Sequence, residues 1–552
     1  MPDSHLGLEG GAAESDSHPL PGQSHAHSWA RPAVWIVLLL AVCVLTLFAN
    51  LGGKDLWGAD ESRHVQRARE MVADRQWMRP TYIGQANFDK PPVHYWLMAG
   101  AGLLLGPTET VFRLPAATFG LLTVLLTFAL GAHLYGVRAG GLAGFVLATA
   151  FLFVFYARAA FIDVPLVACI TGAVLAGHLA LRSDRGWVAA GGLTALFLAG
   201  GTLGKGLAGL VLPLLVLGAS GSAAGRWGRL AGITGAAVLL AAPLYVGLGS
   251  EFTGRFLSFD HLRRFLVAQD ELGGDNPWYF YGPALLGNFL PWTILLPAVG
   301  LALASAPNAW RRWRLPLAWF AVTFVVLTLG ANKREPYLLT LFPALALLVG
   351  AAADDLLAGR AQGRLLTCWR LCLAAVGVTF AAGGPLLPAL WPARLGTVHW
   401  GLWPLVLAGG GLWVAYGAIR RTGFEVLAAT GLLVLAGLQL TVWQLFPAMN
   451  ATRSARAAAA QVRTAAGAAP LAVTKDVHPG LVFYLDLPRP AEALVPAEAI
   501  GDALQAGRLV LTTPAALPPD VLASGRGKVR ATVRFQRLEF VVIEDASGRP
   551  PG

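Results

Sequence analysis

The run AVWIVLLLAVCVLTLFANLGG (residues 33–53) decides the fold class of this chain. It is longer than the roughly 18 apolar residues that a helix needs to cross a hydrocarbon core of about 30 Å. It is also too long for a signal-peptide core and lacks a clean cleavage site, so we predict a retained helix. Similar runs recur as far as Phe446 in a chain of 552 residues that is 55% hydrophobic. This composition predicts a polytopic α-helical membrane protein.

The apolar runs predict about 13 transmembrane helices. We expect them near residues 32–52, 112–134, 139–157, 162–181, 187–203, 206–222, 229–249, 282–304, 315–331, 336–352, 366–389, 400–419 and 424–446. The loops at one end carry Arg138, Arg182, Arg185, Arg226, Arg229, Arg311, Arg312, Arg314, Arg360, Arg364, Arg420 and Arg421. Because cytoplasmic loops are enriched in arginine and lysine, we place these loops and the N-terminus in the cytoplasm. The protein is then a multi-pass membrane protein.

The chain divides into three predicted regions. Residues 1–30 are polar and rich in Gly, Ser and His, which is typical of a disordered cytoplasmic tail. Residues 31–449 form the transmembrane domain, with extracytoplasmic loops at 53–111 and 250–281. Residues 450–552 contain charges, prolines and short β-branched runs such as RLVLTT and RLEFVVIE. They predict a small extracytoplasmic α/β domain without a catalytic constellation of its own.

The stretch WGADESRHVQRARE (57–70) carries many charges in a chain where charged residues are only 13%. Its spacing predicts a helix with Val65, Ala68 and Val72 as an apolar stripe. Asp60 lies near the start of this helix, where the helix dipole stabilises an ionised carboxylate. Arg63, three residues later, is its neighbour on the same helical face. The window is therefore a candidate for the site of the chemistry.

A second charged stretch, ANFDKPPVHYW (86–96), follows. Pro91 and Pro92 fix the backbone and keep Lys90 out of a helix, so the Asp89–Lys90 pair is presented rigidly. The following VHYWLMAGAGLLLG is too short to span and begins with aromatic residues, which predicts an interfacial helix on the membrane surface. A site beside it suits a substrate that is half lipid.

The predicted topology gathers charges from several loops on the extracytoplasmic side. They are Asp60, Asp89, Lys90, Arg158, Asp163, Lys205, Lys333 and Arg334. Asp163 and Lys205 each sit in a short turn between apolar spans, where an unpaired charge is costly, so both are functional-site hypotheses. His261, Arg263 and Arg264 in the loop 250–281 suit either a phosphate site or contacts with lipid headgroups, and both roles remain open.

Seven motifs, in order, carry a resemblance to a known family. They are LWGADESRHVQRARE, FDKPPVHYWLMA, FRLPAATFGLL, ARAAFIDVPL, GTLGKGLAGLVLPLL, NPWYFYGPALLGNFLPW and NKREPYLLTLFPALALLVG. Between about residue 32 and residue 350 the chain resembles the GT-C glycosyltransferases, in particular the aminoarabinose-to-lipid A transferases and related protein mannosyltransferases. The resemblance implies transfer of a sugar from a polyprenyl-phosphate donor to an extracytoplasmic or membrane-embedded acceptor: lipid A, another glycan or lipid, or protein. It also implies a place in the inner (plasma) membrane of a bacterium, and it implies no nucleic acid.

The resemblance also implies roles for individual residues. Asp60 matches the essential acid of the first extracytoplasmic loop, and Asp163 matches the second family aspartate, so both are catalytic candidates. The substrate-binding candidates that match family positions are Arg63, Asp89, Lys90, Lys205, Arg264, Lys333 and Tyr337. Two positions depart from the family pattern, because Asp89 stands where Glu is common and His64 stands where Tyr is frequent.

The chemistry leaves alternatives open. A hydroxyl acceptor needs a base, for which Asp60 is the candidate, whereas a phosphate acceptor needs none and leaves Asp60 and Asp163 to orient it or to contact an amino sugar. No cofactor is certain, although Asp60, Asp89 and Asp163 together suit a divalent cation, and the neighbouring lysines suit a metal-free site. A polytopic lipid or solute transporter or flippase is the alternative function. Transporters usually place ionisable groups near the bilayer midplane within internal repeats, and the charges here sit at span ends.

Overall fold

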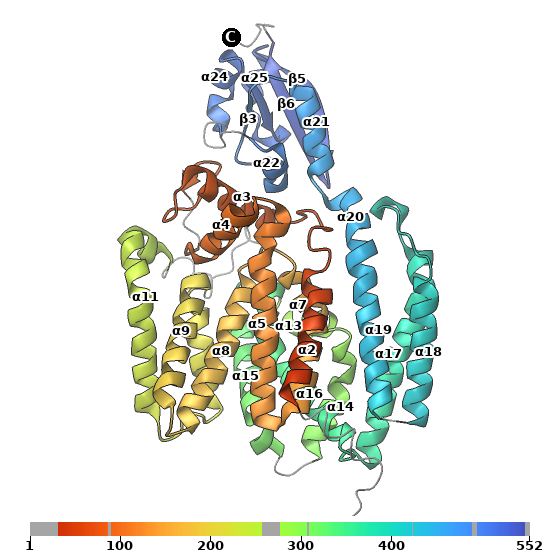
Figure 1. The fold of residues 1–552 in the computed structure, drawn as a ribbon. Coiled ribbons are helices and arrows are strands. Elements are labelled where there is room, and N and C mark those ends of the chain that lie inside the picture. Colours follow the sequence, from red (N-terminus) through yellow and green to blue (C-terminus); the bar gives the residue numbers. More distant parts are fainter. Residues whose placement is uncertain are drawn as a thin grey trace, which may run out of the picture.

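The computed structural model describes residues 31–86, 90–256, 266, 276–305, 309–421, 423–487 and 494–546. A bundle of long helices forms the body of the protein, and a small α/β unit stands on one end of it (Figure 1). Between the two lie α3 (Ala59–Asp74) and α4 (Val93–Leu105). The predicted N-terminal tail and nearly all of the loop after α11 fall outside the described residues.

Eight helices among the described residues are long and apolar enough to cross a membrane, or ten if each of two bent helix pairs counts as one span. The eight are α5 (Glu109–Tyr135), α8 (Asp163–Arg182), α9 (Trp187–Lys205), α11 (Trp227–Arg255), α15 (Ala309–Leu329), η5 with α16 (Glu335–Leu357), α17 (Gly363–Leu390), and the run that begins with α19 (Phe424–Leu440). The predicted polytopic helical membrane fold is confirmed. The number of about 13 spans stays a prediction.

Several predicted spans are shorter or less regular than a straight helix. The first run forms α2 (Pro32–Cys43) and the π-helical turn η1 (Val44–Phe48), and the run at 206–222 forms only α10 (Ala208–Ala219). The span at 139–157 is α6 (Val137–Thr149) bent by 67° into α7 (Phe151–Ala157). The span at 282–304 is α13 (Tyr281–Asn288) bent by 106° into η4 (Trp292–Leu295) and α14 (Leu296–Ala304). Hydropathy reports apolar length but not direction, so these bends were not predicted.

Glycines bring the central helices into close contact. A Cβ added to Gly131 of α5 would lie 2.7 Å from the Cα of Gly140 in α6, and one added to Gly350 of α16 would lie 2.5 Å from the backbone nitrogen of Ala143 in α6. In lipid, where apolar side chains gain little from leaving the solvent, small residues allow the backbone packing that holds helices together. The helix α6 is therefore closely packed between α5 and α16.

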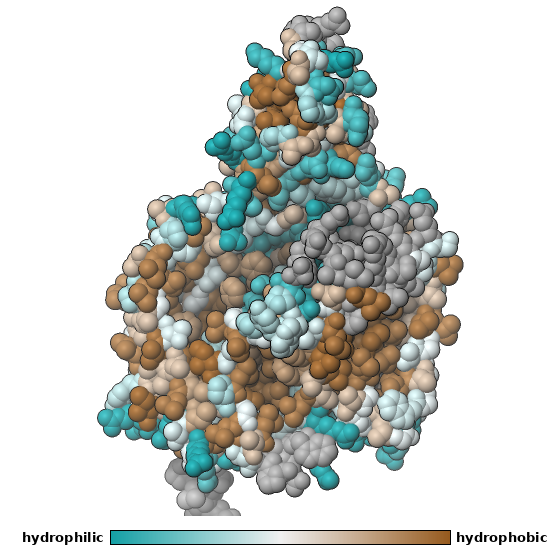
Figure 2. Space-filling model, turned by 180° about the vertical axis from the view of Figure 1, so that it is seen from behind, coloured by the Kyte–Doolittle hydropathy of each residue, from teal (hydrophilic) through white to brown (hydrophobic). Residues whose placement is uncertain are grey.

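The surface supports a membrane setting for the bundle. On the face that Figure 2 shows, the body carries a broad hydrophobic band, and hydrophilic residues gather at the opposite end and over much of the α/β unit. Exposed apolar side chains on the long helices include Leu239 and Val246 of α11 and Leu405 and Leu412 of α18 (Trp403–Arg420). Exposed apolar side chains are unfavourable in water but not among lipid tails, so this surface fits a bundle that lies in a membrane.

The first charged window forms the predicted helix, α3, with Val65 and Ala68 buried and Val72 packed beside them. After α3 the chain makes a two-stranded hairpin, β1 (Thr81–Tyr82) and β2 (Gln85–Ala86), in antiparallel register. The second window leads into α4, which contacts α3 and α5. The end of α4 is apolar and exposed, with Leu104 at 85% exposure, as expected of a helix lying on the membrane surface.

The C-terminal unit is a four-stranded sheet with helices packed on it. The strands are β3 (Leu471–Val473), β4 (Leu509–Thr512), β6 (Leu538–Asp545) and β5 (Gly527–Phe535), in that spatial order, and only the β3–β4 pair is parallel. The helices are α21 (Arg456–Ala466), α22 (Pro479–Leu485), α24 (Ile500–Gln505) and α25 (Pro519–Ala523). Chain from α19 reaches this unit through η7 (Thr441–Leu445) and α20 (Phe446–Arg453).

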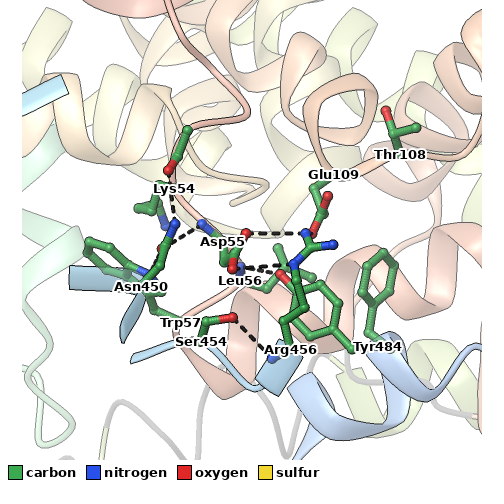
Figure 3. A network of polar contacts seen from close by, with 12 residues as sticks. Lys54, Asp55, Leu56, Trp57, Thr108, Glu109, Asn450, Ser454, Arg456 and Tyr484 are labelled. Carbon is green, nitrogen blue, oxygen red and sulfur yellow. Dashed lines mark hydrogen bonds and ion pairs between the residues drawn. The ribbon is translucent and has the colours of Figure 1, made fainter. Parts of the chain in front are cut away.

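Polar contacts attach the C-terminal unit to the start of the first loop (Figure 3). The Asn450 side-chain oxygen accepts from the Asp55 backbone N–H at 3.0 Å and from Trp57 Nε1 at 2.7 Å, while its Nδ2 donates to the Gly53 carbonyl at 3.0 Å. The Arg456 guanidinium pairs with Asp55 at 3.2 Å and lies 4.6 Å from the centre of the Tyr484 ring. One side chain at the end of the last span thus holds three points of the loop.

We expect Asn450→Ala to loosen the start of the first loop by about 1–3 kcal/mol, because it leaves the indole N–H and a backbone N–H without their acceptor. Hydrogen exchange of residues 53–57 in purified protein measures the change. Arg530→Ala, which removes an exposed ion pair with Glu544 on the same unit, is the control. Unchanged exchange in Asn450→Ala would show that the amide does not hold the loop.

Candidate active site

Four elements end at the surface of the bundle below the C-terminal unit. They are the start of α3, the turn between α7 and α8, the end of α9, and the segment that enters η5 (Glu335–Leu341). Contacts between α8 and α9, α8 and η5, and α7 and η5 bring three of these ends together. The candidate residues Asp60, Asp163, Lys205 and Tyr337 lie on these ends.

Asp60 is held between two guanidinium groups. Arg334 donates to one carboxylate oxygen at 2.8 Å and Arg63 contacts the other at 3.2 Å. Burial alone would raise the pKa of Asp60, but Arg334, with smaller contributions from His64 and Arg63, brings it below its usual range. All three side chains of this cluster remain partly exposed, so a ligand can reach them.

Asp163 and Lys205 form an ion pair between two helix ends. Asp163 is the first residue of α8 and Lys205 is the last residue of α9. An acid at a helix N-terminus and a base at a C-terminus both complement the helix dipoles. The Lys205 ammonium also lies 4.9 Å from the centre of the Tyr337 ring, which is cation–π distance. The pair is mostly buried.

The two clusters share one electrostatic environment. Burial lowers the pKa of Arg334, but Asp60 most strongly, and then Tyr337 and Asp163, raise it above its usual value. Arg334 also donates its backbone N–H to the Tyr281 hydroxyl at 3.1 Å, which fixes where its side chain starts. Arg334 therefore contacts Asp60 and is influenced electrostatically by Asp163. The sequence placed Arg334 on this face but not in the site.

The remaining candidates take different positions. Lys333 is buried, and its ammonium donates to the Gly330 carbonyl at 2.9 Å. Lys90 is half-buried at the start of the segment that leads into α4. Asp89 and Arg264 lie outside the described residues. The assignment of substrate-binding roles to these four residues stays a prediction.

Two histidines near the acids were not predicted as site residues. His94 of α4 is 2% exposed, and neither ring nitrogen has a hydrogen-bond partner among the described residues. Its ring centre is 6.1 Å from that of His64, whose Nδ1 lies 3.0 Å from the Tyr95 hydroxyl. Burial lowers the pKa of His94 to about 4, against the opposing effects of the Ala160 backbone and, more weakly, of Asp163. It is therefore a neutral, buried polar group, and nothing in the PPVHYW pattern signalled its position.

A third buried cluster supports the site from behind. The Glu61 carboxylate, 1% exposed, accepts from Arg113 Nε at 2.8 Å, from Lys54 Nζ at 2.9 Å and from the Ala160 backbone N–H at 3.2 Å. Burial raises the pKa of Glu61, but Arg113 and Lys54 outweigh it and hold the pKa at about 2. Burial lowers the pKa of Lys54 to about 8 against the effect of Glu61. Only the arginine in FRLPAATFGLL hinted at this cluster, because a charge inside an apolar run needs a partner.

The acids do not form a metal site on their own. Within the part of the chain that the structure describes, no group of three His, Cys, Asp or Glu side chains is placed to hold an ion. Asp60 and Asp163 instead face guanidinium and ammonium groups, which oppose a bound divalent cation. The predicted acidic cluster also needs Asp89, so a cation there stays a prediction.

Comparisons with known proteins show the family of this chain. Residues 89–246 match the model of the family described as dolichyl-phosphate-mannose-protein mannosyltransferase. The undecaprenyl phosphate-alpha-4-amino-4-deoxy-L-arabinose arabinosyl transferase 1 of Sodalis glossinidius is 30% identical over 416 residues, which are 70% of this chain and 71% of that protein. This chain belongs to the arabinosyl transferase family.

Solved structures related to the arabinosyl transferase family share the fold. ArnT from Cupriavidus metallidurans, bound to undecaprenyl phosphate, superposes with a TM-score of 0.73 at 22% identity, covering 94% of this chain and 100% of that one. The archaeal oligosaccharyltransferase AglB from Archaeoglobus fulgidus superposes with a TM-score of 0.53 at 13% identity, covering 89% and 70%. The prediction of a GT-C membrane glycosyltransferase is confirmed, and the transporter alternative has no support.

We expect Glu61→Gln to destabilise the protein by about 3–5 kcal/mol near pH 7, because it leaves two buried cations without a compensating charge. The Glu61 pKa of about 2 lies below its ordinary 4.5, so the ionised carboxylate adds stability above pH 4.5 that is lost as the pH falls toward 2. Thermal unfolding between pH 3 and pH 7 should therefore show a shallower acid loss in the variant than in the wild type.

Glu539→Gln is the matched control, because Glu539 forms an exposed pair with Arg534 at 3.1 Å. Its unfolding temperature should follow the wild type at every pH, since exposed pairs contribute little. Equal stability of Glu61→Gln and Glu539→Gln would contradict the supporting role of Glu61.

Proposed function

We propose that the chain transfers a sugar from an undecaprenyl-phosphate-type donor to an acceptor on the side of the membrane that carries the C-terminal unit. The observation that carries this proposal is the gathering of Asp60, Asp163, Lys205 and Arg334 at one membrane-surface site. Relatives in the family are named for an undecaprenyl phosphate-linked aminoarabinose donor. A phosphate headgroup at the bilayer surface is the ligand that such cations fit.

The cations stabilise the leaving group. In the reaction the bond between the sugar C1 and the phosphate oxygen breaks, its electron pair stays on the phosphate, and a new bond joins C1 to an acceptor oxygen. Lys90, Lys205, Arg63 and Arg334 are the groups that we assign to the phosphate. Preorganised cations stabilise developing negative charge best where water is scarce, and Lys205 is already mostly buried.

We assign to Asp60 and Asp163 the role of holding the neighbouring cations and orienting the substrate, rather than that of removing a proton. A carboxylate whose pKa is lowered by a neighbouring guanidinium, as that of Asp60 is, is a weak base. It is well suited to contact the cationic amine of an amino sugar or to keep Arg334 in place. Asp163 has the matching role toward Lys205. This favours an acceptor that needs no deprotonation, such as a phosphate.

The positions of the arginines support the membrane orientation. Arg138, Arg226, Arg312 and Arg360 lie at helix ends remote from the site. We propose that this end is cytoplasmic, as the positive-inside rule requires. The N-terminus then lies in the cytoplasm of a bacterial inner membrane, and the site and residues 450–552 lie outside it.

The proposed reaction is tested with purified enzyme and labelled donors. Undecaprenyl-phosphate carrying aminoarabinose, arabinose or mannose is offered with separate lipid, glycan and protein acceptor fractions. Label transferred to one fraction from one donor supports the proposal and names both substrates. No donor consumption with any fraction would contradict it. Parallel reactions with a chelator test the metal-free site.

We expect Asp60→Asn and Lys90→Ala each to lower transfer at least ~100-fold, the size of effect seen when a preorganised charged group is removed from an active site. Initial rates at saturating donor measure the loss. Asp520→Asn, an exposed acid on α25, is the control and should retain full activity. Wild-type rates in both variants would remove the two residues from the site.

Arg334 offers a sharper check of the geometry. We expect Arg334→Gln to lower kcat/KM, and the Asp60→Asn/Arg334→Gln double variant to be no worse than the poorer single variant. The coupling energy should fall in the range of about 0.5–3 kcal/mol for residues in contact. Losses that simply add would show that Asp60 and Arg334 act independently.

A further inference from the structure

A cavity of about 410 Å³ lies at the arginine-rich end of the bundle, remote from the candidate site. Its lining is Leu134, His178, Arg182, Ser220, Ser222, Arg311, Arg312, Arg314 and Leu315. α8 starts at Asp163 in the site and ends at Arg182 in this lining, about 30 Å away along a helix of this length. The cavity is therefore separate from the transfer chemistry.

The floor of the cavity is polar, buried and ordered. His178, Ser220 and Ser222 are each less than 10% exposed. His178 Nδ1 lies 2.9 Å from the Ser222 hydroxyl, which lies 2.8 Å from the Ser220 hydroxyl. The Ser220 hydroxyl donates to the Leu217 carbonyl at 3.1 Å, and the Ser222 hydroxyl lies between Ser220 and His178. The His178 imidazole is therefore the group of this cluster that can offer a hydrogen bond to an oxygen-rich ligand.

The rim is cationic. Four of the nine lining residues are arginines, and none of the described lining residues is acidic. Arg312 forms an ion pair with Asp355 at 3.0 Å. The side chains of Arg182 and Arg311 are exposed. Arg314 packs on Gly221, where an added Cβ would lie 2.0 Å from the guanidinium. Arginine forks bind phosphate oxygens in two-point geometry.

The setting is the membrane surface. Trp227, at the start of α11, is 59% exposed, and its ring is the nearest neighbour of Gly218 on α10. Exposed tryptophans at helix ends lie at the level of lipid headgroups. Leu215, one turn before the end of α10, is an apolar side chain that is 43% exposed at the surface of the bundle. A phospholipid whose phosphate lies at the rim can therefore place its acyl chains along the apolar surface of the helices.

We propose that this cavity binds the phosphate headgroup of an anionic phospholipid. Basic pockets between membrane helices are suited to such headgroups, because several arginines can contact one lipid phosphate. The apolar path beside α10 favours a membrane lipid over a soluble phosphate. The site is independent of the transfer reaction and of its donor.

Lipid binding is measured on the full-length protein by native mass spectrometry, with phosphatidylglycerol, phosphatidylcholine, or glycerol phosphate added. We expect phosphatidylglycerol to bind at least ~10-fold more tightly than phosphatidylcholine, as charge-assisted contacts predict. An Arg182→Gln/Arg311→Gln variant, altered only at exposed positions, should lose that preference. An Arg420→Gln/Arg421→Gln variant, altered at the same end but outside the cavity lining, should keep it.

Four results would overturn the proposal. The first two are equal binding of the two lipids and an unchanged preference in the Arg182→Gln/Arg311→Gln variant. The third is full displacement of phosphatidylglycerol by glycerol phosphate at equal concentration, which would assign the cavity to a soluble phosphate. The fourth is an equal loss of preference in both arginine variants, which would assign the preference to general surface charge. Circular dichroism of each variant confirms that the fold is retained.

Discussion

The buried carboxylate of Glu61 is the contact on which the site depends. It joins three segments that are far apart in the sequence: the loop at Lys54, the span α5 through Arg113, and the α7–α8 turn through the Ala160 backbone. Asp60 precedes Glu61 on α3, and Asp163 follows Ala160 by three residues. The Glu61 carboxylate therefore fixes the positions of the two segments that carry the candidate acids. Buried ion clusters contribute little net stability but are costly to break, which suits a part whose task is to hold geometry.

The C-terminal unit fixes α3 from its other side. A single apolar cluster runs from Val65 and Met71 of α3 into Leu481 and Val482 of α22. Arg69 adds an ion pair with Asp486 at 2.8 Å and lies 4.2 Å from the Phe483 ring centre. The helix that carries Asp60 is thus packed between the bundle and the α/β unit. A rigid helix on a membrane surface is a better base for a charged site than a solvated loop.

The sequence predicted the fold class and the side of the membrane on which the charged residues lie better than it predicted which side chains are in contact. Apolar length predicted the membrane bundle, and arginine bias with short polar turns predicted which charges share a face. It did not predict the two bent spans, because hydropathy carries no direction. It named Lys333 as a substrate-binding candidate, which stays a prediction, but it did not name Arg334, whose guanidinium donates to Asp60. Neighbouring residues in an extended segment point to opposite sides, and only the tertiary packing decides which side is inward. The buried His94 had no sequence signal at all.

Both aspartates already carry cationic partners, and this constrains how a donor can bind. A phosphate that approaches Lys205 or Arg334 must share a cation with Asp163 or Asp60, so binding is an exchange of partners rather than the filling of an empty positive pocket. The exchange is favourable only if the released carboxylate gains a new contact, because an uncompensated carboxylate near the bilayer is costly. An amine on the transferred sugar would supply that contact. The same ion pairs that prevent a strong attraction for any passing phosphate would then favour a donor that brings both a phosphate and a cation.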